Sequence, residues 1–251
     1  MDAFDAIRGQ SHAVDALRRV VDRGRIASAY LFEGPSGVGK EKAALALARA
    51  VIGEKAWPRI QSGSHPDVRI YRPRDEGHRN IRVEFLREEI LRHAEYAPFE
   101  AKNSFLIFPE ADVSFPEIHP ESGNALLKTL EEPKPGVTFV LLAERPQRLL
   151  PTIRSRSQPL RFQRLDAEVV EAVLAEQGVD AETAVIAAAV GLDIERVEQI
   201  DAAEDSTIRR LAVEGIPCSE RFKLRTHVRC PRCNWRVQTA PCIACTQQRL
   251  S

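Results

Sequence analysis

The chain has 251 residues, of which 43% are hydrophobic and 29% are charged, and its 36 basic residues balance its 36 acidic residues. This composition is typical of a globular protein, and it excludes a disordered chain and one built from long apolar membrane spans. The zero formal charge also excludes binding to nucleic acid through the charge of the chain as a whole.

The N-terminus predicts a protein that is not secreted. Residues 1–5 read MDAFD, which has neither the basic segment nor the apolar run of a secretory signal. We therefore expect a cytoplasmic protein whose five cysteines stay reduced. Reduced cysteines favour metal binding over disulfide bonds.

The first third of the chain predicts helix, strand, loop and helix in turn. Apolar residues at helical spacing predict a helix over residues 7–25. A short apolar strand at residues 29–33 precedes a glycine-rich loop and an alanine-rich helix that reaches about residue 52. Residues 53–80 are rich in Pro, Gly and Arg, which predicts irregular surface structure around one strand near residues 68–71.

The middle of the chain continues to alternate between strands and helices. We predict a helix over residues 83–95, a buried strand at 104–108, a helix around 123–130 and a second buried strand at 137–142. Both strands are continuous apolar runs. This alternation predicts an α/β fold, a P-loop doubly wound parallel sheet.

Beyond the sheet, the pattern predicts two smaller parts. We expect a nucleotide-binding core at residues 1–163, a small helical lid at 164–214 and a basic tail at 215–251. Charge changes sign along this region. Twelve acidic residues and one basic residue lie within 166–205, and nine basic and two acidic residues lie within 209–251.

The loop after the first strand, GPSGVGK at residues 34–40, matches a phosphate-binding loop. Its glycines let backbone N–H groups surround a polyphosphate, its lysine neutralises the charge, and the next helix adds a favourable dipole. A plain glycine-rich turn is the alternative, but the preceding strand and the lysine at the required place argue against it. The predicted ATP-binding residues are Gly34, Gly37, Val38, Gly39, Lys40 and Glu41.

Both protein ligands that such a fold uses for Mg²⁺ are missing. A Ser or Thr hydroxyl should follow the lysine, but the residue there is Glu41. An Asp should end the next buried strand, but Pro109 stands in its place. We expect Glu41 to pair with Lys40 or to repel the phosphates. The sequence therefore predicts ATP binding with impaired hydrolysis.

Six motifs occur in an order typical of one protein family: IRGQ at 7–10, the strand and loop at 29–40, HPD at 65–67, PEAD at 109–112, NALLKTLEEP at 124–133 and LLPTIRSRS at 149–157. Over residues 1 to about 162 the chain resembles the bacterial DNA polymerase III clamp loader subunits of the delta-prime type, which are AAA+ proteins. The resemblance implies the AAA+ fold.

The resemblance also implies roles for three residues. Arg156 matches the arginine that reaches into the ATP site of a neighbouring subunit, and Glu110 matches the catalytic glutamate. Arg196 has the spacing of the lid's sensor arginine, although an ordinary ion pair in an acidic segment explains it equally well. A surface arginine in a basic loop is the alternative for Arg156.

The leading interpretation is a non-hydrolysing stator that, with other clamp loader subunits, helps place the sliding clamp on primed DNA, with no membrane partner. One alternative is an active ATPase motor of the gamma or tau type, against which the missing Mg²⁺ ligands count. Another is a zinc-ribbon module that uses an AAA+ core to bind DNA or a replication protein.

The tail contains two CxxC pairs separated by eight residues. Such pairs can surround one Zn²⁺ tetrahedrally, and the predicted ligands are Cys230, Cys233, Cys242 and Cys245. A redox-active CxxC is the rival for either pair alone. The basic charge of the tail is compatible with a nucleic-acid or acidic-protein contact, and equally with a solvated ribbon that has no partner.

Overall fold

The computed structural model describes residues 2–73 and 80–176. The predicted sensor Arg196 and the four predicted zinc ligands lie outside the described residues. The chain divides into two units, Met1–Arg164 and Leu165–Ser251, and the sheet belongs to the first. In the second unit, the structure describes one helix, α9 (Ala167–Glu176).

The first unit is built on a five-stranded sheet in which all pairs are parallel. The spatial order is β2-β3-β4-β1-β5. The strands are β1 (Ala29–Glu33), β2 (Val68–Ile70), β3 (Ser104–Phe108), β4 (Val137–Ala143) and β5 (Gln158–Arg161). The predicted parallel α/β sheet is confirmed. Because the strands are parallel, the segments that follow β1, β3 and β4 meet at one edge, where such sheets bind ligands.

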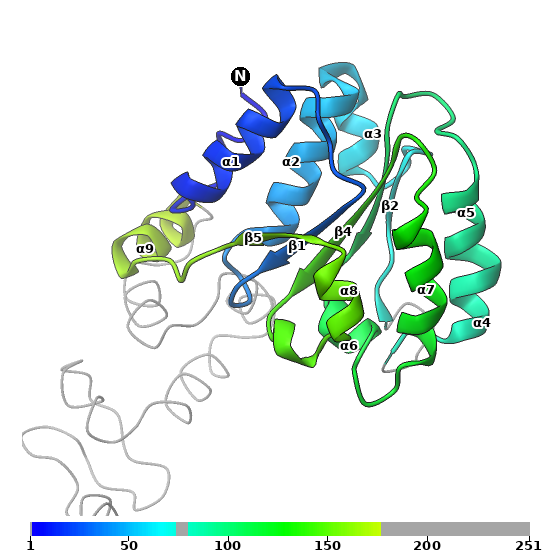
Figure 1. Ribbon diagram of the computed structural model, residues 1–251. Helices are drawn as coiled ribbons and strands as arrows, with labels where there is room; N and C mark the ends of the chain where they lie inside the picture. The colour runs from blue at the N-terminus through cyan, green and yellow to red at the C-terminus, as the bar shows by residue number, and fades with distance from the viewer. Residues whose placement is uncertain (1, 74–79, 177–251) are drawn as a thin grey trace, which may run out of the picture. The chain divides into compact units, whose positions relative to one another are not determined.

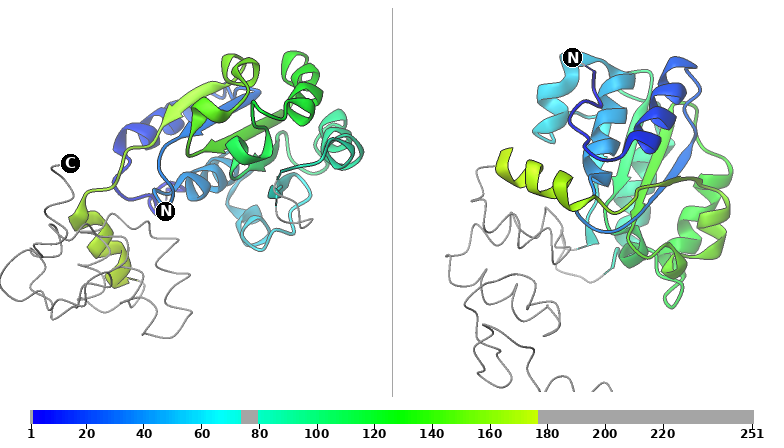
Figure 2. Two further views of the ribbon diagram at one scale, coloured as in Figure 1. Left: turned by 90° about the horizontal axis from the view of Figure 1, so that it is seen from below. Right: turned by 90° about the vertical axis from the view of Figure 1, so that its left-hand side faces the viewer.

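Helices cover both faces of the sheet (Figure 1). One layer holds α1 (Ser11–Asp22), α2 (Lys40–Ile52) and α3 (Trp57–Gln61). The other holds the continuous helical run of α4 (Val83–Phe85), the π turn η3 (Leu86–Leu91) and α5 (Arg92–Glu95), together with α7 (Glu121–Glu131) and α8 (Pro151–Ser155). The views in Figure 2 show the strands between the same two layers.

The core follows the alternation of side chains along the strands. Leu106 and Phe108 of β3, with Phe139 and Leu141 of β4, pack in one buried cluster with Leu126 of α7 and other apolar residues of α4, η3, α5 and α8. Alternate residues of the same strands point to the opposite face, on which α2 packs. This double coverage explains why both strands are continuous apolar runs.

Two segments differ from the prediction. Residues 54–61, expected to be irregular, form a 3₁₀ turn η1 (Glu54–Ala56) and α3, because Pro58 occupies a first-turn position where it costs no helical hydrogen bond. Strand β5 was not predicted. Its sequence, QPLR, buries only Leu160, so it carries almost no apolar signal.

The first helix begins at Ser11, later than predicted. The side chain of Gln10 is buried and exchanges two hydrogen bonds with the backbone of Gln163: Nε2 donates to the carbonyl oxygen at 2.7 Å, and Oε1 accepts from the N–H at 2.9 Å. The glutamine therefore fixes the start of α1 to the segment after β5. Among the described helices, none has the length and apolar character needed to cross a membrane.

Candidate nucleotide-binding and interface sites

The glycine-rich loop lies between the carboxyl end of β1 and the first turn of α2. Gly34 is required by close packing, because a Cβ atom there would lie 2.4 Å from the carbonyl oxygen of Phe162. Its N–H donates to the carbonyl oxygen of Ala143 at 3.1 Å. Gly39 has a φ of +91° and α2 begins at the next residue, so the backbone turns sharply into the helix. The predicted loop residues thus lie together at the edge where open parallel sheets generally bind ligands.

The Lys40 side chain donates hydrogen bonds to the backbone of its own loop. Its Nζ donates to the carbonyl oxygen of Gly34 at 2.8 Å and also to that of Pro35. Both acceptors are neutral. A phosphate oxygen is a stronger partner for an ammonium group than a carbonyl oxygen is, so a polyphosphate can replace these contacts. The loop therefore offers a lysine and a helix N-terminus to an anion.

Glu41 has a partner that was not predicted from the sequence. Its Oε1 lies 2.5 Å from Nη2 of Arg72, which follows strand β2. A charge-assisted contact of this length holds the carboxylate firmly. A cation at this position would have to compete with the guanidinium.

The described residues around the loop do not fit Mg²⁺. Pro109 is buried and offers no side-chain oxygen, and the carboxylate of Glu41 is already paired. The nearby Asp112 is buried, and its two oxygens accept the backbone N–H groups of Glu144 at 3.3 Å and Arg145 at 3.1 Å. Within residues 2–73 and 80–176, no group of three or more His, Cys, Asp or Glu could hold a metal ion.

Glu110 has an unusual backbone. Its φ of +56° is the only positive φ of a non-glycine residue in the described part of the chain. A left-handed residue other than glycine costs about 1 kcal/mol. Its carbonyl oxygen accepts the N–H groups of Val113 and Ser114, both at 2.9 Å, and its side chain is exposed. This strain at the end of β3 is typical of a functional position.

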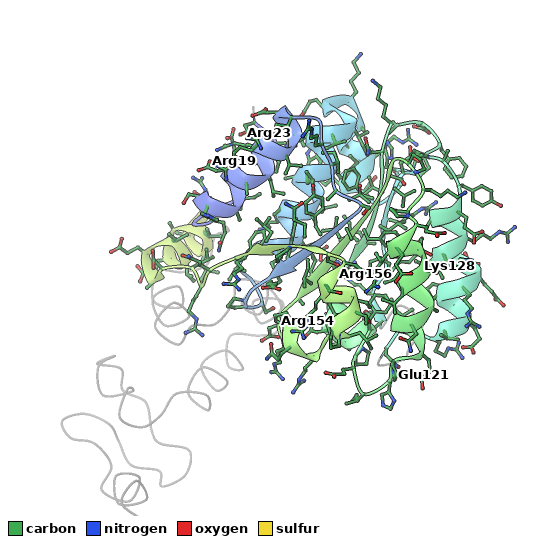
Figure 3. The ribbon with its side chains drawn as sticks, in the orientation of Figure 1. Arg19, Arg23, Glu121, Lys128, Arg154 and Arg156 are labelled. Atoms are coloured by element: carbon green, nitrogen blue, oxygen red, sulfur yellow. The ribbon has the colours of Figure 1, made fainter. Side chains whose placement is uncertain are left out.

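Arg156 lies at the end of α8, on the sheet face opposite to α2 (Figure 3). Its Nη1 donates to the carbonyl oxygen of Thr152 at 3.0 Å and to Oγ of Ser155 at 3.4 Å. Its Nη2 lies 2.5 Å from Oε1 of Glu131 at the end of α7. The side chain remains 34% exposed, so a molecule docking on α8 could reach it.

The structure thus separates two groups of predicted residues. Residues 34–41 and Glu110 follow β1 and β3 at the same sheet edge, whereas Arg156 belongs to the layer of α7 and α8. The sequence did not single out Arg72 or Glu131, because each acts through a contact between distant segments.

Comparison with known proteins identifies the family. The family model for DNA polymerase III, delta subunit, matches residues 9–166. The DNA polymerase III subunit delta' of Bacillus subtilis is 36% identical over 180 residues, which cover 68% of this chain and 52% of that protein. The subunit delta' of Pseudomonas aeruginosa is 33% identical over 145 residues, covering 53% of this chain and 42% of that protein. The chain therefore spans about half the length, or less, of these curated relatives.

Solved structures agree on the fold. The Thermotoga maritima RuvB Holliday junction branch migration motor matches with a TM-score of 0.55 at 15% identity, covering 88% of this chain and 74% of that one. A DNA polymerase III gamma subunit-related protein from Thermotoga maritima matches with a TM-score of 0.50 at 20% identity, covering 84% and 72%. These likenesses support the AAA+ fold, and the family match shows that the chain belongs to the DNA polymerase III delta subunit family.

Proposed function

We propose that this chain is a delta-prime-like stator of a bacterial clamp loader in the cytoplasm. It binds other clamp loader subunits and helps them place the sliding clamp on primed DNA, and it holds nucleotide without hydrolysing it. The observation that carries this proposal is the state of the ATP site. The glycine loop and Lys40 have the geometry of a phosphate site, whereas Glu41 is paired with Arg72 and Pro109 replaces the second metal ligand.

Binding and hydrolysis need different parts of the site. Loop N–H groups, the α2 N-terminus and Lys40 can hold a polyphosphate. Hydrolysis additionally needs a cation that supports the charge developing on the transferred phosphoryl group, which Mg²⁺ normally supplies. Glu110 could still orient water, but without that support the rate falls by orders of magnitude. The chain would therefore bind nucleotide at its own site and contribute to hydrolysis at the site of a neighbouring subunit.

That role is assigned to Arg156, acting on the ATP of a neighbouring subunit. A planar guanidinium stabilises charge on a transferring phosphoryl group, and supplying it from another subunit couples hydrolysis to assembly. The side chain is partly exposed, and the residue follows α8, which lies on the face opposite to the chain's own α2 (Figure 3).

Arg156→Ala in an assembled loader tests this role. Turnover at the neighbouring site should fall by about 10³-fold or more, which is the rate enhancement that such an arginine usually provides. Arg148→Ala is the matched control, because Arg148 is an exposed arginine in the preceding turn, η4 (Pro146–Arg148). Normal turnover in an assembled Arg156→Ala complex would disprove the role.

A second experiment tests the disabled ATP site. The isolated chain with Mg²⁺ should bind ATP but show no measurable turnover, and a Glu41→Thr, Pro109→Asp double variant should gain turnover if the metal ligands are what is missing. Turnover near 1 per second by the unmodified chain, typical of slower enzymes, would contradict the proposal.

We also propose that the tail binds one Zn²⁺ through Cys230, Cys233, Cys242 and Cys245. The support is their spacing in the sequence, since two CxxC pairs supply the four thiolates of a structural site. With few apolar residues around it, such a tail depends on its metal for folding.

A further inference from the structure

We infer that Glu131 is a positioning residue that orients Arg156 toward the neighbouring subunit. This inference rests on the proposed role of Arg156 in trans and names a second residue for it. The observation is the ion pair between Oε1 of Glu131 and Nη2 of Arg156, at 2.5 Å. Both side chains are partly exposed, at 50% and 34%, so the pair lies at the surface within reach of a neighbouring subunit.

Glu131 and Arg156 lie at the ends of two helices, α7 and α8, that pack against each other. Helices α7 and α8 approach closely at Gly123, where a Cβ atom would lie 3.4 Å from side-chain atoms of both Leu150 and Ile153. Leu150 and Ile153 are buried, and they belong to the main core cluster. Since close-packed helices have little freedom to shift, this contact limits the movement of α7 against α8. The packing of α7 against α8 therefore limits how far Glu131 can move relative to Arg156.

The contacts around Arg156 leave part of its guanidinium open. This group has five N–H donors. Nη1 donates to the Thr152 carbonyl oxygen and to Oγ of Ser155, whereas Nη2 faces Oε1 of Glu131 in an ion pair. Nε has no acceptor in the described part of the chain, so the guanidinium keeps donors for a phosphate. The ion pair with the carboxylate thus holds the side chain in a form that can still bind an anion.

The sign of the effect separates positioning from plain electrostatics. A negative charge near the neighbour's ATP would repel the phosphates, so its removal alone should raise activity. If Glu131 orients Arg156, its removal should lower activity, because the freed arginine samples many rotamers before reaching the phosphate. Loss of one partly exposed ionic contact corresponds to a decrease of about two- to fivefold.

The experiment measures turnover at the neighbouring ATP site in an assembled loader that carries Glu131→Gln. We expect kcat to fall about two- to fivefold while KM for ATP stays the same, because the neighbour's own loop binds the nucleotide. Glu132→Gln is the matched control, since Glu132 is the next residue, is exposed and makes no ion pair among the described residues. Glu131→Asp keeps the charge and should recover part of the lost kcat.

A double variant decides whether Glu131 acts through Arg156. In an Arg156→Ala background, Glu131→Gln should have no further effect. An equal fall in that background, an unchanged kcat or a raised kcat in Glu131→Gln alone would each overturn the inference. The proposed function is judged separately by Arg156→Ala alone. If that variant is inactive and Glu131→Gln is normal, only the role of Glu131 fails, and if Arg156→Ala is normal, the proposed function itself fails.

Discussion

Removing the Asp67 carboxylate should destabilise the core more than any ordinary surface change. Asp67 is 2% exposed, and its two oxygens accept the backbone N–H groups of Phe99 at 2.6 Å, Glu100 at 2.8 Å and Ala101 at 2.9 Å. Each hydrogen bond to a charged group contributes about 1.5–3 kcal/mol. The three share one carboxylate, so they are not additive, and the freed N–H groups of an exposed loop can bind water. We therefore expect Asp67→Ala to lower the free energy of unfolding by about 3 kcal/mol.

Urea unfolding of the full chain, followed by circular dichroism, measures this loss. It corresponds to a decrease in Tm of about 6–12 °C for a domain of this size. Hydrogen exchange localises the effect, because the amides of residues 99–101 should lose their protection. Asp67→Asn keeps one acceptor oxygen and should lose about half as much, and Glu117→Ala, an exposed loop carboxylate, should lose almost nothing. A loss below about 1 kcal/mol with unchanged exchange would refute the argument.

Three further predictions follow from single residues. Gly34→Ala should lower stability by about 2 kcal/mol or more and weaken nucleotide binding, because the new Cβ would meet the carbonyl oxygen of Phe162, and thermal unfolding with a nucleotide titration checks both. Burial raises the pKa of Tyr71 to about 12 from 10.0, so the folded chain holds this proton to a higher pH than the unfolded chain does and its stability should fall between pH 10 and 12. Tyr71→Phe should make this fall smaller, and the part that remains includes Tyr30, whose pKa burial also raises. Elemental analysis should find about one Zn²⁺ per chain, and Cys230→Ser should reduce it.

Two strands with strong apolar signals were predicted to the residue, and β4 was predicted one residue short, at 137–142. The predictions for 29–33 and 104–108 match β1 and β3, because strands buried on both faces need unbroken apolar runs. Strand β5 was missed because an edge strand can be mostly polar, with Leu160 as its only buried residue. Helix α3 was missed because its proline reads as a breaker when its place in the first turn is unknown.

The same distinction applies to the candidate sites. Gly34 and Lys40 were predicted as phosphate-loop residues because the whole motif lies within residues 34–40 of the sequence. Arg72 and Glu131 were not, because their partners lie 31 and 25 residues away along the chain and only the folded arrangement of α2, α7 and α8 joins them. The sequence shows which chemical groups are present, but contacts between distant segments decide which of them are already paired.

The structure also explains how a phosphate loop can persist without metal ligands. Gly34 is constrained by the backbone of Phe162, and its N–H binds the end of β4 through Ala143, so the fold requires this glycine whether or not nucleotide is bound. A hydroxyl at position 41 and a carboxylate at position 109 would have no such role, because Glu41 finds a partner in Arg72 and Pro109 is buried at the end of β3 without harm to the strand. The packing of the fold therefore maintains the geometry of the glycine loop, whereas it does not require side chains that ligate a metal. With the role proposed for Arg156, a subunit can lose metal ligation while it keeps the geometry of the loop.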